Sequence, residues 1–176
     1  TIAFGAYLGR FAGSALLGDV REIVAVTPTG WIASWWTIAA AIALASLGFG
    51  MLFRARLAEF PWILAAAGIG FTVARMVANA ANPESRAIVS AFAGALTVGL
   101  FGNIYARVAD RPSTVPILPG LLILVPGSIG YRALTAFADH DALIGVESAA
   151  EMLMVAAALV GGLLVANAAL PPRRIL

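Results

Sequence analysis

Residues 112–132 read PSTVPILPGLLILVPGSIGYR, and this stretch decides the fold. It carries no charge before Arg132, and about 20 apolar residues are enough to cross a hydrocarbon core roughly 30 Å thick. An interior proline, however, removes a helical hydrogen bond at a cost of roughly 3 kcal/mol, and in lipid the freed carbonyls need protein or water as partners. The stretch therefore predicts a broken membrane helix, buried among other helices or lining a cavity, with breaks at two Pro-Gly pairs: Pro119-Gly120 and Pro126-Gly127.

The composition places the rest of the chain in a membrane as well. Of 176 residues, 61% are hydrophobic and 11% are charged, and the mean hydropathy is +0.95. Soluble domains carry about 25% charged residues. The apolar runs are long enough for helices, and they do not show the roughly 10-residue alternating strands of an outer-membrane barrel. We therefore predict an all-α integral membrane protein.

The apolar runs divide the chain into about six transmembrane helices, one of them broken. We expect these at residues 1–18, 32–53, 60–80, 87–106, from 112 to about 137, and 147–170. Threaded alternately through a bilayer, they place six arginines on one side: Arg54, Arg56, Arg107, Arg111, Arg173 and Arg174. The opposite loops carry two arginines and five acidic residues. Because arginine is enriched in cytoplasmic loops, we predict that the first side and the C-terminus are cytoplasmic.

The Pro126 break is the first candidate binding site. A discontinuous membrane helix offers backbone amides without helical partners and the positive end of a half-helix dipole. We expect the amides of Gly127, Ser128 and Ile129 to hold a carboxylate, with the Ser128 hydroxyl as a further donor. The alternative is a structural kink whose glycines serve packing. The residues of the expected break are Pro119, Gly120, Pro126, Gly127 and Gly130.

Charges inside the expected spans are the second group of candidates. A charge in lipid costs about 3 kcal/mol or more, so these side chains should face the bundle, form pairs or touch water. Arg75 is a candidate ligand for a substrate carboxylate, and Asn79 is a further polar donor on the same helix. Glu151 lies four residues after Glu147, on one helical face, and is the candidate proton carrier. The alternative is structural: an Arg–Glu pair, or snorkelling to the interface.

Two further patterns predict helix packing. Asn103 and Asn167 are expected to form interhelical hydrogen bonds rather than to bind a ligand. Small residues also recur four apart, which lets helices approach closely. These stripes are Ala41 and Ala45; Ala91, Ala95 and Gly99; and Ala158, Gly162 and Ala166.

The sequence offers little for catalysis or metal binding. It has no cysteine, which excludes a thiolate metal site and a thiol nucleophile, and it lacks H-E-x-x-H, Walker A and G-x-G-x-x-G motifs. His140, the single histidine, lies in a polar turn and is expected to be solvated. A Ser128–His140–Asp141 hydrolase has no G-x-S-x-G elbow. We expect no enzymatic activity, no cofactor, no metal site and no nucleic-acid partner.

Two segments resemble the threonine/serine exporter family. Residues 48–76 read GFGMLFRARLAEFPWILAAAGIGFTVARM, and residues 102–134 read GNIYARVADRPSTVPILPGLLILVPGSIGYRAL. The order of features is the specific part: F-x-M-x-F before the arginines, the pair Arg75-Met76, and P-G-S-x-G-Y-R from residue 126. The similarity covers about residues 31–172, and it is to the membrane domain that forms the C-terminal half of these exporters or stands alone as a smaller subunit.

The resemblance implies a function and a partner. Members of this family export small amino acids such as threonine and serine with energy from the proton gradient, and related two-subunit members are linked to dicarboxylate export. Their other half resembles a cytosolic hydrolase-like region followed by about five spans. The present chain starts at Thr1 and lacks that half, so we expect a subunit or a piece of a longer protein. Residues 1–18 would then be the last helix of the preceding half, 19–30 an external loop and 173–176 a cytoplasmic tail.

Taken together, the residues predict a secondary transporter in the bacterial inner membrane, and the resemblance implies that it exports threonine or serine with proton coupling. Its expected partners are the amino-acid substrate, the lipid bilayer, the N-terminal half or larger subunit, and further copies of itself. Alternatives are an exporter of small dicarboxylates and a non-transporting scaffold or oligomerisation module.

Overall fold

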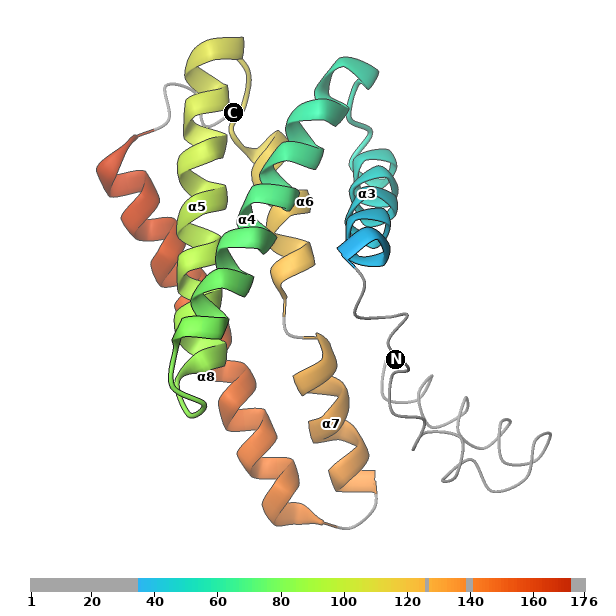
Figure 1. Cartoon of the computed structure of the whole chain (residues 1–176), viewed down its shortest axis with the longest axis vertical. Helices are drawn as coiled ribbons and strands as arrows, with labels where there is room; N and C mark the ends of the chain where they lie inside the picture. The colour runs from blue at the N-terminus through green and yellow to red at the C-terminus, as the bar shows by residue number, and fades with distance from the viewer. Residues whose placement is uncertain (1–34, 126, 139–140, 172–176) are drawn as a thin grey trace, which may run out of the picture. The chain divides into compact units, whose positions relative to one another are not determined.

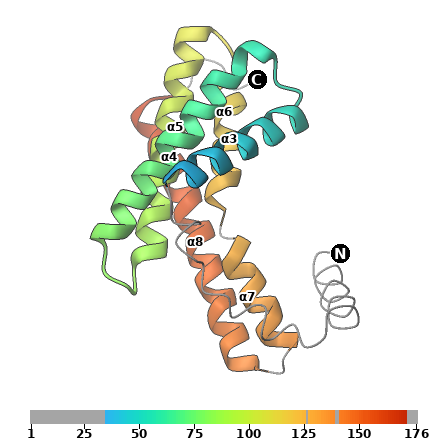
Figure 2. The ribbon, with the colours of Figure 1, turned by 45° about the vertical axis from the view of Figure 1, so that its right-hand side comes forward.

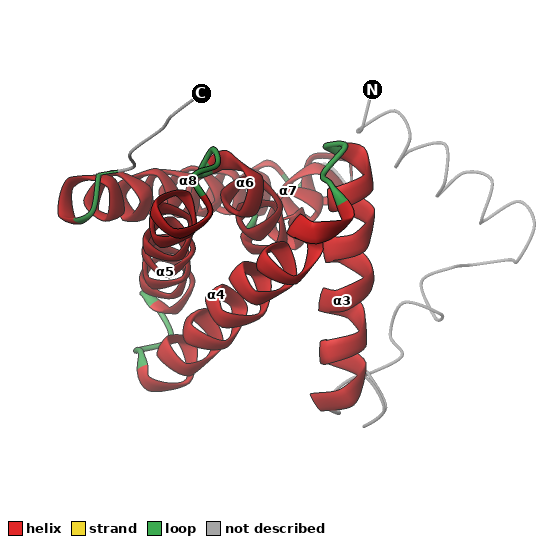
Figure 3. Ribbon diagram, turned by 90° about the horizontal axis from the view of Figure 1, so that it is seen from above, coloured by secondary structure: helices red, strands yellow, loops and turns green. Residues whose placement is uncertain are grey.

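The computed structural model describes residues 35–125, 127–138 and 141–171, and within these ranges it is helical, without strands. The all-α prediction is therefore confirmed, as Figure 3 shows. The elements are α3 (Trp35–Leu52), the 3₁₀ turn η1 (Leu57–Glu59), α4 (Phe60–Ala80), α5 (Arg86–Ala109), α6 (Thr114–Leu124), α7 (Gly127–Ala138) and α8 (Ala142–Ala169). The expected helix 1–18, the loop 19–30 and the tail 173–176 lie outside the described residues.

The helices match the predicted spans closely. Four stretches of the described chain are long and apolar enough to cross a membrane: α3, η1 with α4, α5 and α8. The pair α6 and α7 makes a fifth if it is counted as one bent span.

The chain divides into two compact units, residues 1–38 and 39–176. The described part of the first unit is the start of α3, where the rings of Trp35 and Trp36 stack with centroids 3.6 Å apart. All the other elements belong to the second unit.

In the second unit α5 packs against α4, α6 and α8 (Figure 1). The predicted small-residue stripes of α5 and α8 meet at this contact. A methyl group on Gly99 would lie 2.6 Å from Ala166 Cβ, and one on Gly162 would lie 3.0 Å from Ala95 Cβ. These positions therefore let the two backbones approach, as expected. Ala41 of the third stripe is exposed on α3.

Polar contacts tie α5 to α8 near the ends of both helices. Asn103, fully buried, donates from Nδ2 to Oδ1 of Asn167 at 2.8 Å. Arg107 Nη2 donates to the carbonyl oxygen of Pro171 at 2.9 Å. The predicted interhelical role of the two asparagines is confirmed. The second contact brings Arg107 to the same end of the domain as the chain that follows α8.

The Pro119-Gly120 pair does not break the helix, contrary to the sequence prediction. Pro119 lies inside α6 and is buried. Gly120 lets α6 approach its neighbours, since a methyl group there would lie 2.9 Å from Val98 Cγ1 of α5 and 3.7 Å from Ala66 Cβ of α4. The favourable packing energy offsets the cost of the hydrogen bond that the proline removes. Pro119 and Gly120 are therefore helix-packing residues.

Candidate functional site

The predicted break lies at the second Pro-Gly pair. Helix α6 ends at Leu124, α7 begins at Gly127, and the axes of 114–124 and 129–138 differ by 43°. Val125 is extended, with ψ 131°, as expected for a residue that precedes proline. The two halves take different neighbours: α6 packs against α4 and α5, whereas α7 packs against α8 (Figure 2).

The start of α7 determines which groups the break offers. The Gly127 amide donates to Val125 O at 2.8 Å, so it is occupied in this conformation. The next amides, of Ser128 and Ile129, belong to a first helical turn, which has no intrahelical acceptors for its N–H groups. The Ile129 side chain is apolar and packs against the buried cluster that includes Ala95 and Leu159. Ile129 can therefore offer a ligand only its backbone N–H group. The side chain of Ser128 and all of Pro126 lie outside the described part of the chain.

Arg75 lies at the depth of the break. A methyl group on Gly94 of α5 would lie 3.1 Å from Ala74 Cβ and 3.0 Å from Leu124 Cδ1. The residue before Arg75 is thus level with the last residue of α6. Arg75 and Asn79 are four apart on α4 and both are exposed, so they form a polar strip on the face of α4 that is turned away from the core.

Glu151 lies at the level of the first turn of α7. A methyl group on Gly130 would lie 3.1 Å from the sulfur of Met152, the next residue of α8. Helix α8 begins earlier than predicted, at Ala142, with Ile144 N donating to the Asp141 cap at 3.3 Å. Glu151 is therefore roughly 14 Å along the helix rather than near its end. Its side chain is half-buried, whereas Glu147 is exposed.

Arg75 and Glu151 do not form the Arg–Glu pair that was the structural alternative. Across residues 35–125, 127–138 and 141–171 no ion pair joins them. Both charges thus lie at the depth of the break, on α4 and α8, without neutralising each other.

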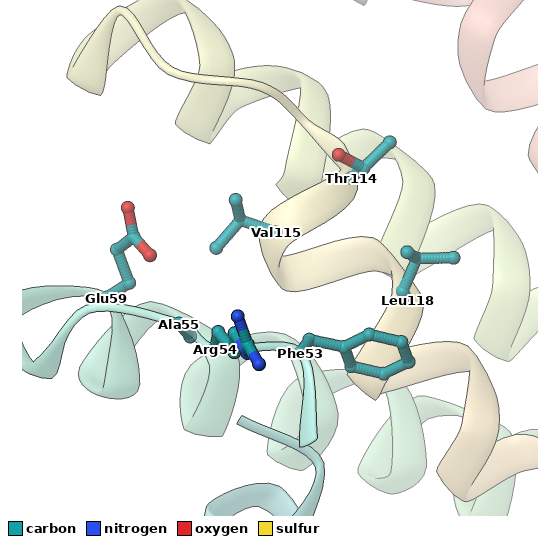
Figure 4. Close-up of a pocket in the computed structure, with 7 residues that line it drawn as sticks. All are labelled: Phe53, Arg54, Ala55, Glu59, Thr114, Val115 and Leu118. Carbon is teal, nitrogen blue, oxygen red and sulfur yellow. The ribbon is translucent and has the colours of Figure 1, made fainter. Parts of the chain in front are cut away.

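A second polar site, which the sequence analysis missed, lies at the arginine-rich end. Glu59 is 8% exposed; its Oε2 accepts the Arg56 backbone N–H at 2.9 Å, and its Oε1 pairs with Arg111 Nη1 at 3.2 Å. It borders a cavity of about 230 Å³ between the α3–α4 connection and the first turns of α6 (Figure 4). The lining residues are Phe53, Arg54, Ala55, Glu59, Thr114, Val115 and Leu118.

A larger hollow between α5 and α8 has a different character. It measures about 480 Å³ and is lined by apolar side chains and a glycine: Ile88, Val89 and Phe92 of α5, and Met154, Ala157, Ala158 and Gly161 of α8. With no hydrogen-bonding side chain in its wall, it suits a lipid tail better than a polar solute.

Comparison with known proteins identifies the architecture. Residues 38–169 match the family described as "Threonine/Serine exporter, ThrE". The chain belongs to the threonine/serine exporter family. This makes it a multi-pass membrane protein of a transporter family, and the resemblance that the two sequence segments suggested is confirmed.

A curated relative of this exporter-family domain is the pheromone-regulated membrane protein 10 of Yarrowia lipolytica, which is 30% identical over 107 residues. The match covers 59% of the present chain and 9% of the relative, so the chain spans a small part of that protein's length. No solved structure matches this exporter-family chain.

One signal for the missed site was present in the exporter-family sequence. Glu59 directly precedes Phe60-Pro61, where a carboxylate at a helix start is stabilised by the helix dipole. Its pairing with Arg111, 52 residues later, depends on how α4, α5 and α6 pack and has no local sequence pattern.

Proposed function

We propose that this domain is the membrane part of a proton-coupled secondary transporter that exports small amino acids such as threonine and serine. The observation that carries the proposal is the interruption between Leu124 and Gly127 in a bent span of an exporter-family chain. A break in lipid leaves backbone groups without partners, and transporters use such groups to bind polar solutes near the midplane.

The proposed binding mode follows from the groups at the break. The Ser128 and Ile129 amides and the positive end of α7 hold the substrate carboxylate. Arg75, at the depth of the break, and Asn79, about one turn further along α4, provide a cation and an amide for the substrate as it passes. The substrate crosses by alternating access, in which α6 with α4 and α7 with α8 change their mutual angle between Leu124 and Gly127.

Glu151 is the proposed coupling group. Its half-buried side chain lies inside α8 at the level of the first turn of α7, and a carboxyl group can take up and release a proton. Proton uptake from the outside and release to the inside would alternate with substrate export. In this proposal the domain lies in the bacterial inner membrane with its C-terminus in the cytoplasm, and it works with a larger subunit or preceding half and with further copies of itself.

Arg75→Ala tests the binding role. In proteoliposomes containing the complete exporter, we expect its half-saturating concentration for labelled threonine to rise about tenfold or more, because a hydrogen-bonded charge on the substrate loses its partner. Arg86→Ala, an exposed arginine at the start of α5, is the control and should export like the wild type.

Other results would change the assigned role of Arg75 or the proposed substrate. Export by Arg75→Ala that matches the wild type at every threonine concentration would remove Arg75 from the site. Transport of labelled succinate but not threonine by the wild type would favour the dicarboxylate alternative, and transport of neither would favour a scaffold.

A further inference from the structure

The cavity at the arginine-rich end brings opposite charges together within apolar walls. Arg54 and Glu59 contribute a cation and a carboxylate, Thr114 a hydroxyl, and Phe53 and Leu118 apolar surface. Arg54 and Glu59 come from the α3–α4 connection, whereas Thr114 and Leu118 come from α6 (Figure 4). This cavity is separate from the Leu124–Gly127 break, which lies at the other end of α6.

Arg54 occupies a backbone position that normally favours glycine. Its φ is +54°, and the Arg54 and Ala55 amides donate to Met51 O and Gly50 O at 3.0 and 2.9 Å. These two bonds form a Schellman motif with Arg54 in the left-handed position. A residue with a side chain is strained in this conformation relative to glycine. An arginine in this position, directed to a cavity wall, points to a role for its guanidinium rather than for its backbone.

Glu59 is held in position but is not fully used as an acceptor. Arg56 N and Arg111 Nη1 each occupy one of its carboxylate oxygens. An ionised carboxylate has about four acceptor positions, so room remains for another donor. Because Arg111 already balances its charge, Glu59 can receive an ammonium only when that ligand brings its own negative group.

We propose that this cavity binds the zwitterion of a small α-amino acid, with its ammonium on Glu59 and its carboxylate on Arg54. The inference rests on the proposed export function and adds a loading site at the arginine-rich end. The volume of about 230 Å³ is large enough to hold threonine, which has eight non-hydrogen atoms. A phosphate group would use Arg54 alone, because it has no ammonium to donate to the open acceptor positions of Glu59.

The test is substrate protection of a reporter cysteine in the cavity. In the complete exporter, with other cysteines removed and in nanodiscs of neutral lipid, Thr114→Cys is alkylated with a maleimide. We expect L-threonine to slow the reaction. L-Threoninamide, which lacks the carboxylate, and 2,3-dihydroxybutyrate, which lacks the ammonium, should protect about tenfold more weakly.

Variants of the same reporter protein test whether Arg54 binds the carboxylate of threonine and Glu59 its ammonium. Arg54→Gln should raise the half-protecting threonine concentration about tenfold. Arg56→Gln is the matched control and should leave it unchanged, because this neighbouring arginine contributes its backbone N–H and does not line the cavity. Glu59→Gln should abolish the preference for threonine over 2,3-dihydroxybutyrate. Within the described ranges the Arg54 guanidinium forms no ion pair, so Arg54→Gln keeps the proposal testable if Glu59→Gln fails to fold.

Arg54→Gly separates function from structure. It should raise the Tm of the protein or leave it unchanged, since it relieves the left-handed backbone, and yet it should weaken protection like Arg54→Gln. A lower Tm with unchanged protection would mean a structural arginine and would overturn the proposal.

Three further results would also overturn the loading site. One is equal protection by threonine and both analogues. Another is an unchanged half-protecting concentration in Arg54→Gln. The third is protection by added phosphatidylglycerol in place of threonine. If the wild type exports threonine in any of these cases, the export function stands and the loading site alone is wrong. If the wild type neither binds nor exports threonine, both are wrong.

Discussion

Glu151→Gln is expected to abolish proton-driven export of threonine. In proteoliposomes with the complete exporter, a pH gradient should no longer drive threonine against its concentration gradient. Exchange of labelled for unlabelled threonine should continue, because glutamine fills the same space but cannot exchange a proton. The reason is position: Glu151 is half-buried roughly 14 Å inside α8, next to the residue that contacts the first turn of α7.

Glu147→Gln is the control for this experiment. Glu147 lies one turn earlier on the same helix and is exposed, so its replacement should leave coupling intact. Concentrative export by Glu151→Gln at the wild-type rate would show that another group carries the proton.

Gly162→Ala is expected to destabilise the domain. A methyl group on Gly162 would lie 2.5 Å from Phe92 O and 2.9 Å from Leu96 N, which are both backbone atoms of α5. Backbone cannot rotate away as a side chain can, so α5 and α8 must move apart and lose packing. We expect the free energy of unfolding to fall by about 1–3 kcal/mol, measured by thermal unfolding in detergent.

The neighbouring Gly161 provides a matched control. A methyl group there would lie 3.8 Å from the nearest carbons of Phe92, an ordinary van der Waals distance. Gly161→Ala should therefore unfold at the wild-type temperature or slightly above, since alanine favours helix over glycine. Equal Tm values for the two variants would contradict the close approach of α5 and α8.

The helices were largely predictable because each span is a long apolar run that ends at charges or at Asn-Pro. The position of the break could not be predicted from Pro-Gly alone, since the sequence has two such pairs, one inside α6 and one just after it. At Pro119 the helix continues because Gly120 packs against Val98, and that contact depends on tertiary structure. Between Leu124 and Gly127 the helix ends, and the chain changes neighbours from α4 to α8.

The candidate site was predictable only in part. Arg75 and Glu151 were identifiable because a charge in an apolar run needs an explanation. Their depths relative to the break required the contacts of Ala74 and Met152. The cavity was not predictable. Glu59 and Arg111 are 52 residues apart, and no local sequence pattern indicates the left-handed backbone of Arg54.

The central claim is that a polar solute passes the interruption between α6 and α7. Gly127→Cys tests this directly, because the 176-residue sequence has no cysteine and a side chain at Gly127 meets no other atom within 4 Å. A charged maleimide added to the complete exporter, with any cysteines outside this chain removed, should label Gly127→Cys, and threonine should slow the reaction. Leu122→Cys, on the exposed side of α6, should stay unlabelled. If Gly127→Cys resists the reagent from both sides of the membrane, or if threonine has no effect on its labelling, the solute does not pass this break.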